Sequence, residues 1–373
     1  MAALATAEFP ALRRDTTIFS GEHADYRESF RTFLAREAVP VRGEWAKGGD
    51  IPRALLRTAG EYGYLGMRVP EEFGGAGVDD ARFGAVIGEE AMLAGVPALA
   101  LVLVTHNDIA LPAILGGPAA VAEPWLAKLA SGETLATVVE GDVVFEDEGD
   151  AVRLTGTAKA VVAGAAANLF VVVATAADGS GRVVLALVER DEAAVAVERC
   201  EAPVGLDAAG LATVRLDGVR GPMLGEGAEP LMVSQAVALA LTGLAGARAA
   251  LAITTRYVID RKAFGQPLAA FQNTRRMLAS VIADIDVATA HVDRLLSGQL
   301  EGQVPLRAAL AAKLFCTELY DRAVDAGVQL HGGYGYILEY EIAHAYIDAR
   351  FWRLHEPNNE ALKDTIADSL FSA

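Results

Sequence analysis

The sequence predicts an α+β protein with three parts: an all-α N-terminal domain over residues 1–132, a middle β-barrel or β-sandwich domain over 133–226, and a C-terminal helical domain over 227–373. Two changes of periodicity predict this order. Apolar residues recur at helical spacing up to Glu133, give way to short β-branched segments, and return to helical spacing beyond Glu229. A chain of 373 residues is also long enough for two or three packed units.

The N-terminal domain is predicted to be helical because apolar side chains recur every three or four residues, as at Tyr26, Phe30 and Phe33. The expected helices cover residues 23–48, 51–64, 82–95, 97–115 and 118–129. We expect residues 1–20 to form a loosely held arm and the glycine-rich segment 71–77 to form a turn.

The middle domain is predicted to consist of antiparallel strands, because its apolar segments are short, β-branched and bounded by glycine or aspartate. The expected strands cover residues 135–139, 152–154, 169–174, 183–188, 195–198 and 212–216. We expect this domain to close at Gly221 and Pro222, after which the helical pattern resumes.

The C-terminal domain is predicted to hold three long helices and two shorter ones, with Asn358 or Asn359 capping the last. Their expected ranges are 232–262, 269–300, 306–331, 337–345 and 360–371. Residues 234–253 are the most apolar stretch, but polar residues interrupt it. We therefore expect a buried helix and no membrane span.

Composition excludes several classes of function. A net charge of −17, from 32 basic and 49 acidic residues, disfavours binding to nucleic acid or to a membrane surface. The two cysteines, Cys200 and Cys316, are far apart and no secretory leader is visible, so we expect a reducing, cytoplasmic location. Neither a metal-binding motif nor a glycine-rich turn that joins a strand to a helix is found, so we expect no metal site and no dinucleotide fold.

Three blocks in the C-terminal third, 261–272, 329–336 and 348–356, resemble the acyl-CoA dehydrogenase family in order and spacing. The resemblance implies the same three-domain order, with a C-terminal four-helix bundle. It also implies an FAD enzyme of lipid metabolism that removes two hydrogens from the α and β carbons of an acyl thioester. The electrons would pass to an electron-transfer flavoprotein or a similar acceptor.

Glu356 is the candidate catalytic base. In the family a glutamate often follows an Asp-Ala-Arg/Lys segment by a few residues, and Glu356 lies six residues after Arg350. We expect Phe351, Trp352 and Leu354 to form an apolar wall, since a desolvated carboxylate binds protons more tightly. The family usually continues with glycine and threonine, whereas Pro357 follows here and disfavours helical backbone at Glu356.

The resemblance also implies a set of FAD-binding residues, which would hold the diphosphate and adenosine of a cofactor bound mainly by a neighbouring subunit. An arginine pairs well with a diphosphate, and glycines allow a close approach of the backbone. An asparagine near the base could bind the ribityl chain. The residues are Arg261, Phe264, Gln272, Gln329, Gly332, Gly333 and Asn358.

The segments that would hold the flavin ring depart from the family. Members usually carry a Thr-Glu-Pro loop, whereas this chain runs from Thr137 through Glu140 and Gly141 directly into the next strand. A Trp-Ile-Thr-Asn contact is replaced by residues 161–167, a small apolar stretch after Lys159. Apolar side chains of this kind cannot hydrogen-bond the N5 or O4 atom of a flavin.

The chain therefore keeps the half-site that it would lend to a neighbour and lacks the one that it would use itself. This predicts a heteromeric dehydrogenase, as in some actinobacterial members, in which a different, intact subunit completes the sites. The alternatives are a homo-oligomeric flavoenzyme (a dimer or tetramer) with a rebuilt loop, a non-catalytic partner subunit, and a flavin monooxygenase of this fold. Glu356 argues against the monooxygenase.

The substrate side is less specific. Gln235 lies roughly where some members carry an alternative basic glutamate, and it is neutral. No arginine is found close to Ala236, where many members use one near coenzyme A, although a polyanionic thioester would need local basic residues on so acidic a chain. The acyl group, and the choice between coenzyme A and a carrier protein, stay open.

Overall fold

The computed structural model describes residues 17–201 and 203–371, so most of the predicted N-terminal arm lies outside the described residues. These residues form two compact units, each built from separate stretches of the chain. Unit 1 comprises the N-terminal stretch up to residue 39, residues 85–100 and everything from residue 236 onward; unit 2 comprises residues 40–84 and 101–235. Because these units cut across the three predicted domains, the boundaries at 132/133 and 226/227 stay predictions.

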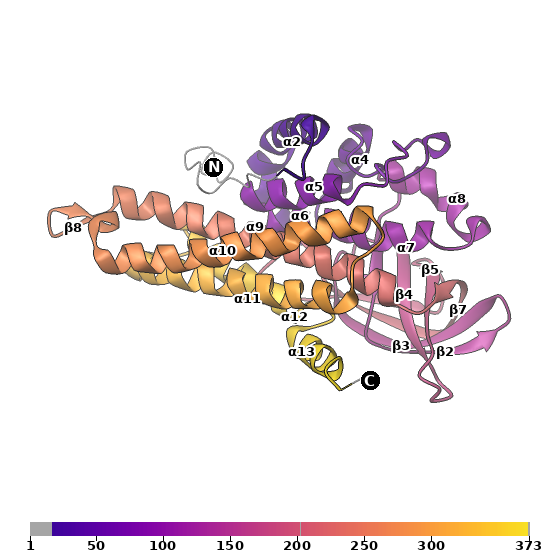
Figure 1. The fold of residues 1–373 in the computed structure, drawn as a ribbon. Helices are drawn as coiled ribbons and strands as arrows, with labels where there is room; N and C mark the ends of the chain where they lie inside the picture. Colours follow the sequence, from indigo (N-terminus) through magenta and orange to yellow (C-terminus); the bar gives the residue numbers. More distant parts are fainter. Residues whose placement is uncertain (1–16, 202, 372–373) are drawn as a thin grey trace. The chain divides into compact units, whose positions relative to one another are not determined.

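The N-terminal part is helical, as predicted (Figure 1). The segment expected over 23–48 is interrupted near Pro40, which has no N–H to donate. The helical segments are α2 (Gly21–Phe33), η2 (Leu34–Ala38), η3 (Val39–Val41), α3 (Arg42–Gly48), α4 (Arg53–Glu61), η4 (Glu71–Phe73), α5 (Ala81–Leu93), α6 (Pro97–Val104), η5 (Thr105–Ala110), α7 (Leu111–Leu115) and α8 (Ala119–Ala130).

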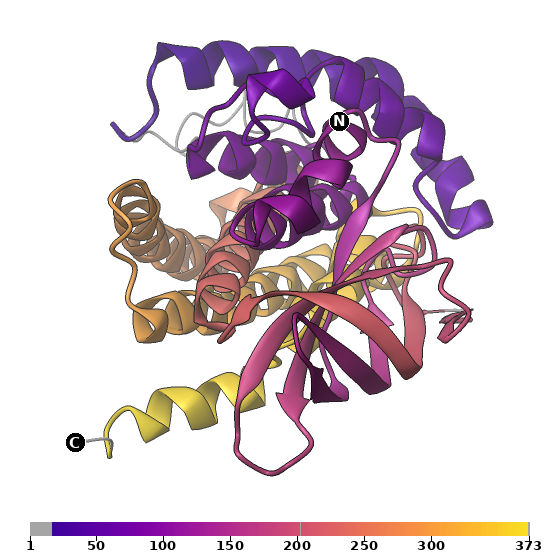
Figure 2. The ribbon, with the colours of Figure 1, turned by 90° about the vertical axis from the view of Figure 1, so that its right-hand side faces the viewer.

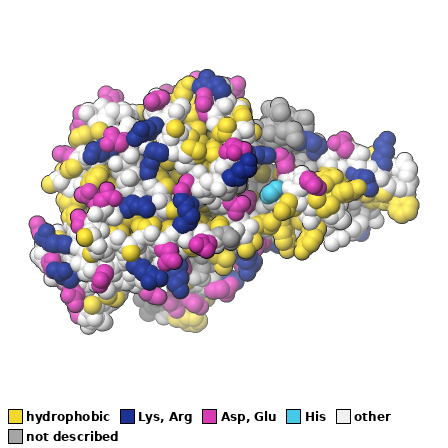
Figure 3. All heavy atoms as spheres, turned by 180° about the vertical axis from the view of Figure 1, so that it is seen from behind, with side chains coloured by type: hydrophobic (Ala, Val, Ile, Leu, Met, Phe, Trp, Pro, Cys, Tyr) yellow, Lys and Arg dark blue, Asp and Glu magenta, His cyan; other side chains and the backbone are white. Residues whose placement is uncertain are grey.

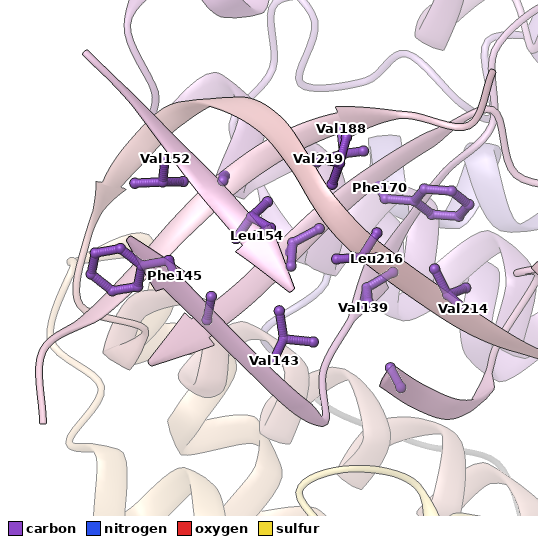
Figure 4. Close-up of a cluster of buried hydrophobic side chains, with 14 of the residues drawn as sticks. Val139, Val143, Phe145, Val152, Leu154, Phe170, Val188, Val214, Leu216 and Val219 are labelled. Atoms are coloured by element: carbon purple, nitrogen blue, oxygen red, sulfur yellow. The ribbon is translucent and has the colours of Figure 1, made fainter. Parts of the chain in front are cut away.

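The middle region is a closed barrel. Its sheet runs in the order β1-β4-β2-β3-β7-β5, and pairing of β4 with β5 closes the ring, while β6 pairs with β7 (Figure 2). Apolar side chains from several strands, among them Phe145, Leu154 and Phe170, fill the interior (Figure 4). The strands are β1 (Ala136–Val139), β2 (Asp142–Glu148), β3 (Ala151–Val161), β4 (Leu169–Ala176), β5 (Val183–Glu189), β6 (Val195–Arg199) and β7 (Ala212–Glu226).

Two strand predictions are wrong. The sheet is not wholly antiparallel, because β4 pairs in parallel with both β1 and β2. In addition, β7 continues past Gly221 and Pro222, where we expected the domain to close. At that point Pro222 pairs with Ala151, the first residue of β3, and a side chain on Gly221 would meet the carbonyl oxygen of Leu187 at 2.8 Å. The glycine therefore marks close packing inside a strand, and not a turn.

The C-terminal part is an elongated helical bundle (Figure 1). The expected helix over 337–345 is wrong: the helix begins at Glu341 and contains the whole Asp348–Arg353 motif. The last helix also ends earlier than expected, at Asp368. The elements are α9 (Glu229–Asp260), β8 (Lys262–Ala263), β9 (Gln266–Pro267), η6 (Leu268–Ala270), α10 (Gln272–Leu300), α11 (Leu306–His331), η7 (Gly332–Tyr336), α12 (Glu341–Leu354) and α13 (Asn359–Asp368).

Glycines of α9 allow α11 to pack closely against it. A Cβ atom on Gly243 would lie 3.2 Å from the Cys316 carbonyl oxygen, and one on Gly246 would lie 2.6 Å from the Tyr320 ring. The Gly-x-x-Gly sequence that failed as a dinucleotide motif is thus a helix-packing device. On the same helix Thr242 accepts a 2.8 Å hydrogen bond from the buried indole N–H of Trp352, so α12 is tied to the same core.

Within residues 17–201 and 203–371, two helical stretches are apolar and long enough to cross a membrane, namely residues 97–115 and 229–260. Their most apolar windows are 72% and 94% buried inside the protein. This burial identifies both as core helices, as expected for the stretch 234–253.

His106 predicts an acid-sensitive fold. Its ring is fully buried and its Nδ1 accepts a 3.1 Å hydrogen bond from the Ala136 N–H, and burial lowers its pKa from 6.5 to about 4. Between these values the unfolded chain binds a proton that the folded chain does not, so the free energy of unfolding falls as the pH falls from about 6.5 to about 4. The expected loss is about 3 kcal/mol.

Urea unfolding of the wild type and of His106→Asn at several pH values between 4 and 7 measures this effect. The variant is expected to lose less stability on acidification, because Asn cannot take up the proton. Parallel curves for the two proteins would contradict the assignment.

Candidate functional site

Glu356 lies in the turn between α12 and α13. Helix α12 ends at Leu354 because His355 adopts an extended conformation (φ −60°, ψ 133°) and Pro357 follows. The peptide bond between Glu356 and Pro357 is cis. The Glu356 side chain is exposed, and its Oε2 accepts hydrogen bonds from the backbone N–H of Asn358 (3.1 Å) and from its Nδ2 (3.4 Å). The turn itself therefore orients the carboxylate.

The expected apolar wall beside Glu356 is wrong. Trp352 is fully buried in the bundle, because its indole reaches Thr242, and Leu354 is 57% exposed. Phe351 packs its edge against the His355 ring, with centroids 5.6 Å apart. Helical geometry explains why Trp352 is separated from the other two. Phe351 and Leu354 are three residues apart and share a face of the helix, whereas Trp352 points in a different direction.

Lys313 of α11, which the sequence analysis missed, lies directly beneath this turn. It is completely buried, and its ammonium donates to the carbonyl oxygens of His355 (2.8 Å) and Pro357. Burial and the Lys313 charge lower the pKa of His355 to about 4, so its ring is neutral at pH 7. The available signal was a lysine on the apolar face of a predicted helix, which requires partners elsewhere in the fold.

Of the two predicted caps, Asn358 and Asn359, the structure shows that Asn358 caps α13. Its Oδ1 accepts from the backbone N–H groups of Glu360 (3.2 Å) and Ala361 (3.1 Å), which would otherwise be unpaired at the helix start. Its Nδ2 faces Glu356. Both ends of the Asn358 amide are therefore engaged within the turn, and contact with a ribityl chain stays a prediction.

A second cluster of predicted residues occupies the far end of the bundle. The Arg261 guanidinium lies over the Tyr334 ring at 5.3 Å, which joins the end of α9 to η7. Phe264 is 96% exposed in the β8–β9 hairpin, where it and Gly265 have positive φ. The edge contact of Phe264 with Phe271 connects the hairpin to the start of α10, which begins at Gln272. Apolar side chains are visible on this end of the bundle (Figure 3).

Gln329, Gly332 and Gly333 contribute the remaining surface of this cluster, and all three are exposed. A Cβ atom added to either glycine would meet nothing within 4 Å, so a flat or bulky group can approach the backbone there. The chain from 260 to 276 carries four basic residues and one acidic residue, which makes this end locally cationic on an acidic protein. An accessible arginine, two amides and open glycines fit the diphosphate and adenosine of FAD.

The structure thus groups six predicted FAD residues at one end of the bundle and places Asn358 with Glu356 elsewhere. The distance between the two clusters can be estimated along helix α11, because Lys313 contacts the Glu356 turn and Gln329 belongs to the distal cluster. Sixteen helical residues span about 24 Å at 1.5 Å per residue. The two clusters are therefore separate parts of unit 1.

The β domain lacks room for the Thr-Glu-Pro loop that is usual in the family, as the sequence predicted. Only Glu140 and Gly141 connect β1 to β2. A side chain on Gly141 would lie 2.9 Å from the Ala158 Cα atom, so the turn is pressed against β3. The Glu140 carboxylate accepts a 3.4 Å hydrogen bond from the buried amide of Gln235, also in unit 2.

Residues 163–167 offer little to a flavin ring. Their side chains are hydrogen atoms or methyl groups, and all five backbone N–H groups donate to carbonyl oxygens within the β domain at 2.7–3.1 Å. The buried hydroxyl of Thr137 likewise donates to the Val162 carbonyl oxygen at 2.6 Å. Donors already used in this way cannot also bind N5 or O4, so this segment does not fit the isoalloxazine contact.

Comparisons with known proteins agree with this architecture. Two family models match the chain, acyl-CoA dehydrogenase N-terminal domain over residues 20–133 and C-terminal domain over 230–371. The long-chain specific mitochondrial acyl-CoA dehydrogenase of Sus scrofa is 30% identical, over 94% of this chain and 86% of its own. Benzylmalonyl-CoA dehydrogenase of Aromatoleum aromaticum is also 30% identical, over 94% and 98%.

Solved structures show the same fold. The acyl-CoA dehydrogenase of Geobacillus kaustophilus superposes with a TM-score of 0.86 at 29% identity, covering 94% of this chain and 98% of that one. An acyl-CoA dehydrogenase of Bacillus anthracis, solved in complex with FAD, gives a TM-score of 0.82 at 27% identity, covering 97% and 70%. The expected order of a helical domain, a β-barrel and a helical domain is confirmed.

The Asn358 cap yields a local stability prediction. Asn358→Ala removes the acceptor for two N–H groups and is expected to destabilise α13 by about 1 kcal/mol, whereas Asn358→Ser keeps a capping oxygen. Amide hydrogen exchange within residues 359–368 measures the opening of this helix directly. Equal exchange rates in the alanine variant and the wild type would show that the cap contributes nothing.

Proposed function

The chain belongs to the acyl-CoA dehydrogenase family, and from that premise we propose that Glu356 is the base that removes the α proton of an acyl thioester. The observation that carries this proposal is the turn after α12. It presents an accessible carboxylate at the end of the family motif, oriented by two donors from Asn358. The reaction is α,β-dehydrogenation, a redox reaction at a CH–CH bond.

The protein groups supply the proton transfer and the orientation. An α hydrogen of a thioester is weakly acidic, so a carboxylate positioned within hydrogen-bond reach of it provides general-base catalysis. FAD, the cofactor of the family, supplies the acceptor for the β hydride. Glu356 takes the α proton on a carboxylate oxygen, and the Asn358 donors restrict the directions from which it does so. An electron-transfer flavoprotein or a similar acceptor would reoxidise the enzyme.

The distal cluster is proposed to bind the diphosphate and adenosine of an FAD whose ring belongs to a neighbouring subunit. Arg261, Gln272 and Gln329 supply the cation and the amides, and Gly332 and Gly333 supply the open backbone. The separation of about 24 Å along α11 supports this division, since the distal cluster and Glu356 then serve different cofactors. The protein is accordingly proposed to be an oligomer.

A specific observation favours a hetero-oligomer as the assembly. In residues 163–167 every backbone N–H is already used and every side chain is apolar or absent, so this segment offers no free donor to a flavin ring. A different subunit with intact ring contacts would be completed by the Arg261 cluster of this chain. In the stronger form of this alternative, the chain completes its partner's site without turning over substrate itself.

The substrate is proposed to be an acyl-CoA, because the relatives named above include enzymes for long-chain and benzylmalonyl thioesters of coenzyme A. An acyl group on a carrier protein is the alternative. We propose a cytoplasmic location, on the basis of two distant cysteines and an acidic chain.

Glu356→Gln is expected to lower kcat for acyl-CoA dehydrogenation by about 10²- to 10⁴-fold, since the amide keeps the shape and loses the base. Dye-coupled turnover of the flavin-loaded assembly measures it. Glu360→Gln is the matched control, because Glu360 is an exposed carboxylate in the next turn that pairs with Lys363. Unchanged turnover in Glu356→Gln would remove Glu356 from the mechanism.

Flavin content tests the division of the cofactor site. Expressed alone, the chain is expected to purify with little flavin. Co-expressed with an intact dehydrogenase subunit, it is expected to give a yellow, flavin-containing complex. Arg261→Gln should lower flavin retention in the complex, whereas Arg322→Gln, which breaks an exposed ion pair with Asp284, should not. A fully flavin-loaded chain expressed alone would contradict the hetero-oligomer.

A further inference from the structure

Lys313 is an unusual residue for its position. It lies on the face of α11 that also carries the buried residues Leu310, Cys316 and Thr317, and its side chain is completely buried. Removing an ammonium from water costs several kcal/mol unless hydrogen bonds replace the lost hydration. Such a residue persists where its donors have a defined task, so the identity of its acceptors indicates that task.

The acceptors of Lys313 lie on both sides of Glu356. Its Nζ donates to the carbonyl oxygen of His355, one residue before Glu356, and to that of Pro357, one residue after. The carbonyl of Glu356 itself lies 2.8 Å from the His355 Nδ1. Because a carbonyl oxygen can only accept, Nδ1 carries a proton and donates it. Three consecutive carbonyls around Glu356 are therefore held by two side chains.

A second anchor lies one helical turn along α11. The hydroxyl of Thr317 is 3.2 Å from the Oδ1 and 3.0 Å from the Nδ2 of Asn359, and both residues are buried. This pair holds the start of α13, and neither side chain hydrogen-bonds the backbone at 355–357. The two anchors therefore hold different segments. Thr317 holds the start of α13, while Lys313 holds the main chain on both sides of Glu356.

We propose that Lys313 is a positioning residue, whose ammonium fixes the main chain on both sides of Glu356 and thereby sets the direction of its carboxylate. The inference rests on the proposed role of Glu356 as the base. Lys313 itself touches no reacting atom in this proposal. Its contribution is geometric, because a displacement of a catalytic group by about 1 Å can cost 10²-fold in rate.

The test uses the flavin-loaded assembly with Lys313→Met, which keeps the length of the side chain and removes its donors. We expect kcat to fall about 10- to 100-fold with little change in KM, since the substrate-binding surface is untouched. Lys313→Gln, whose amide still donates without a charge, should recover part of the loss. Thr317→Val is the matched control, because it removes the anchor of α13 and leaves both Lys313 hydrogen bonds in place.

A double-mutant cycle separates positioning from general stability. In the Glu356→Gln background, Lys313→Met should cause no further loss of the residual rate, because there is no base left to position. A purely structural lysine would lower stability and activity by the same factor in both backgrounds, which would overturn the proposal. If Lys313→Met fails to fold, the same cycle with Lys313→Gln decides.

The two proposals fail in different ways. Full turnover in Glu356→Gln alone would refute the proposed base, and with it the role of Lys313. A strong loss in Glu356→Gln together with normal kcat in Lys313→Met and Lys313→Gln would refute only the positioning role.

Discussion

Helix α11 sets the geometry on which both candidate clusters depend. Near its start, Lys313 and Thr317 hold the turn that carries Glu356, and its last turn carries Gln329 beside the open glycines. The rise of an α-helix fixes the distance between them at about 24 Å. Close packing against Gly243 and Gly246 of α9 leaves this helix little freedom to bend. A single chain therefore presents Glu356 and the distal cluster as two separate surfaces.

The β domain indicates why the distal cluster is proposed to serve a neighbouring subunit. A subunit that bound its own flavin ring would need free donors near the ends of β1 and β3, but residues 163–167 provide none, and only the two residues Glu140 and Gly141 join β1 to β2. The same chain keeps a local excess of basic residues between 260 and 276 despite a net charge of −17. The chain thus lacks the family's contacts to the flavin ring but keeps basic residues suited to the diphosphate. This difference is the physical basis for proposing that unlike subunits share each flavin site.

Local patterns in the sequence predicted local structure well. The helix over 306–331 was predicted to the residue because Pro305 and Gly332 bound its apolar repeat. A cap at Asn358 or Asn359 was predicted because capping depends on neighbouring residues, and Asn358 is the one that caps α13. The helix expected over 337–345 was wrong, since Ile337 and Leu338 are exposed and only resembled a helical stripe. Helical periodicity alone does not distinguish a buried face from an exposed turn.

Features that depend on distant residues were not predictable in this way. The parallel pairing of β4 with β1 joins residues that are about thirty positions apart in the sequence, such as Ala136 and Leu169. The hydrogen-bond acceptors of Lys313 are carbonyl groups 42 and 44 residues away in the sequence, so its role could not be predicted from its neighbours. The apolar wall beside Glu356 failed for the same reason, because the partner of Trp352 is Thr242, 110 residues earlier.

An experimental structure of the FAD-loaded assembly tests the central claim most directly. We expect Arg261 and Gln329 of this chain to contact the diphosphate or adenosine of a flavin whose ring is bound by another subunit, with residues 163–167 making no polar contact to a ring. A flavin whose N5 or O4 accepts a hydrogen bond from residues 163–167 of this chain would contradict the claim.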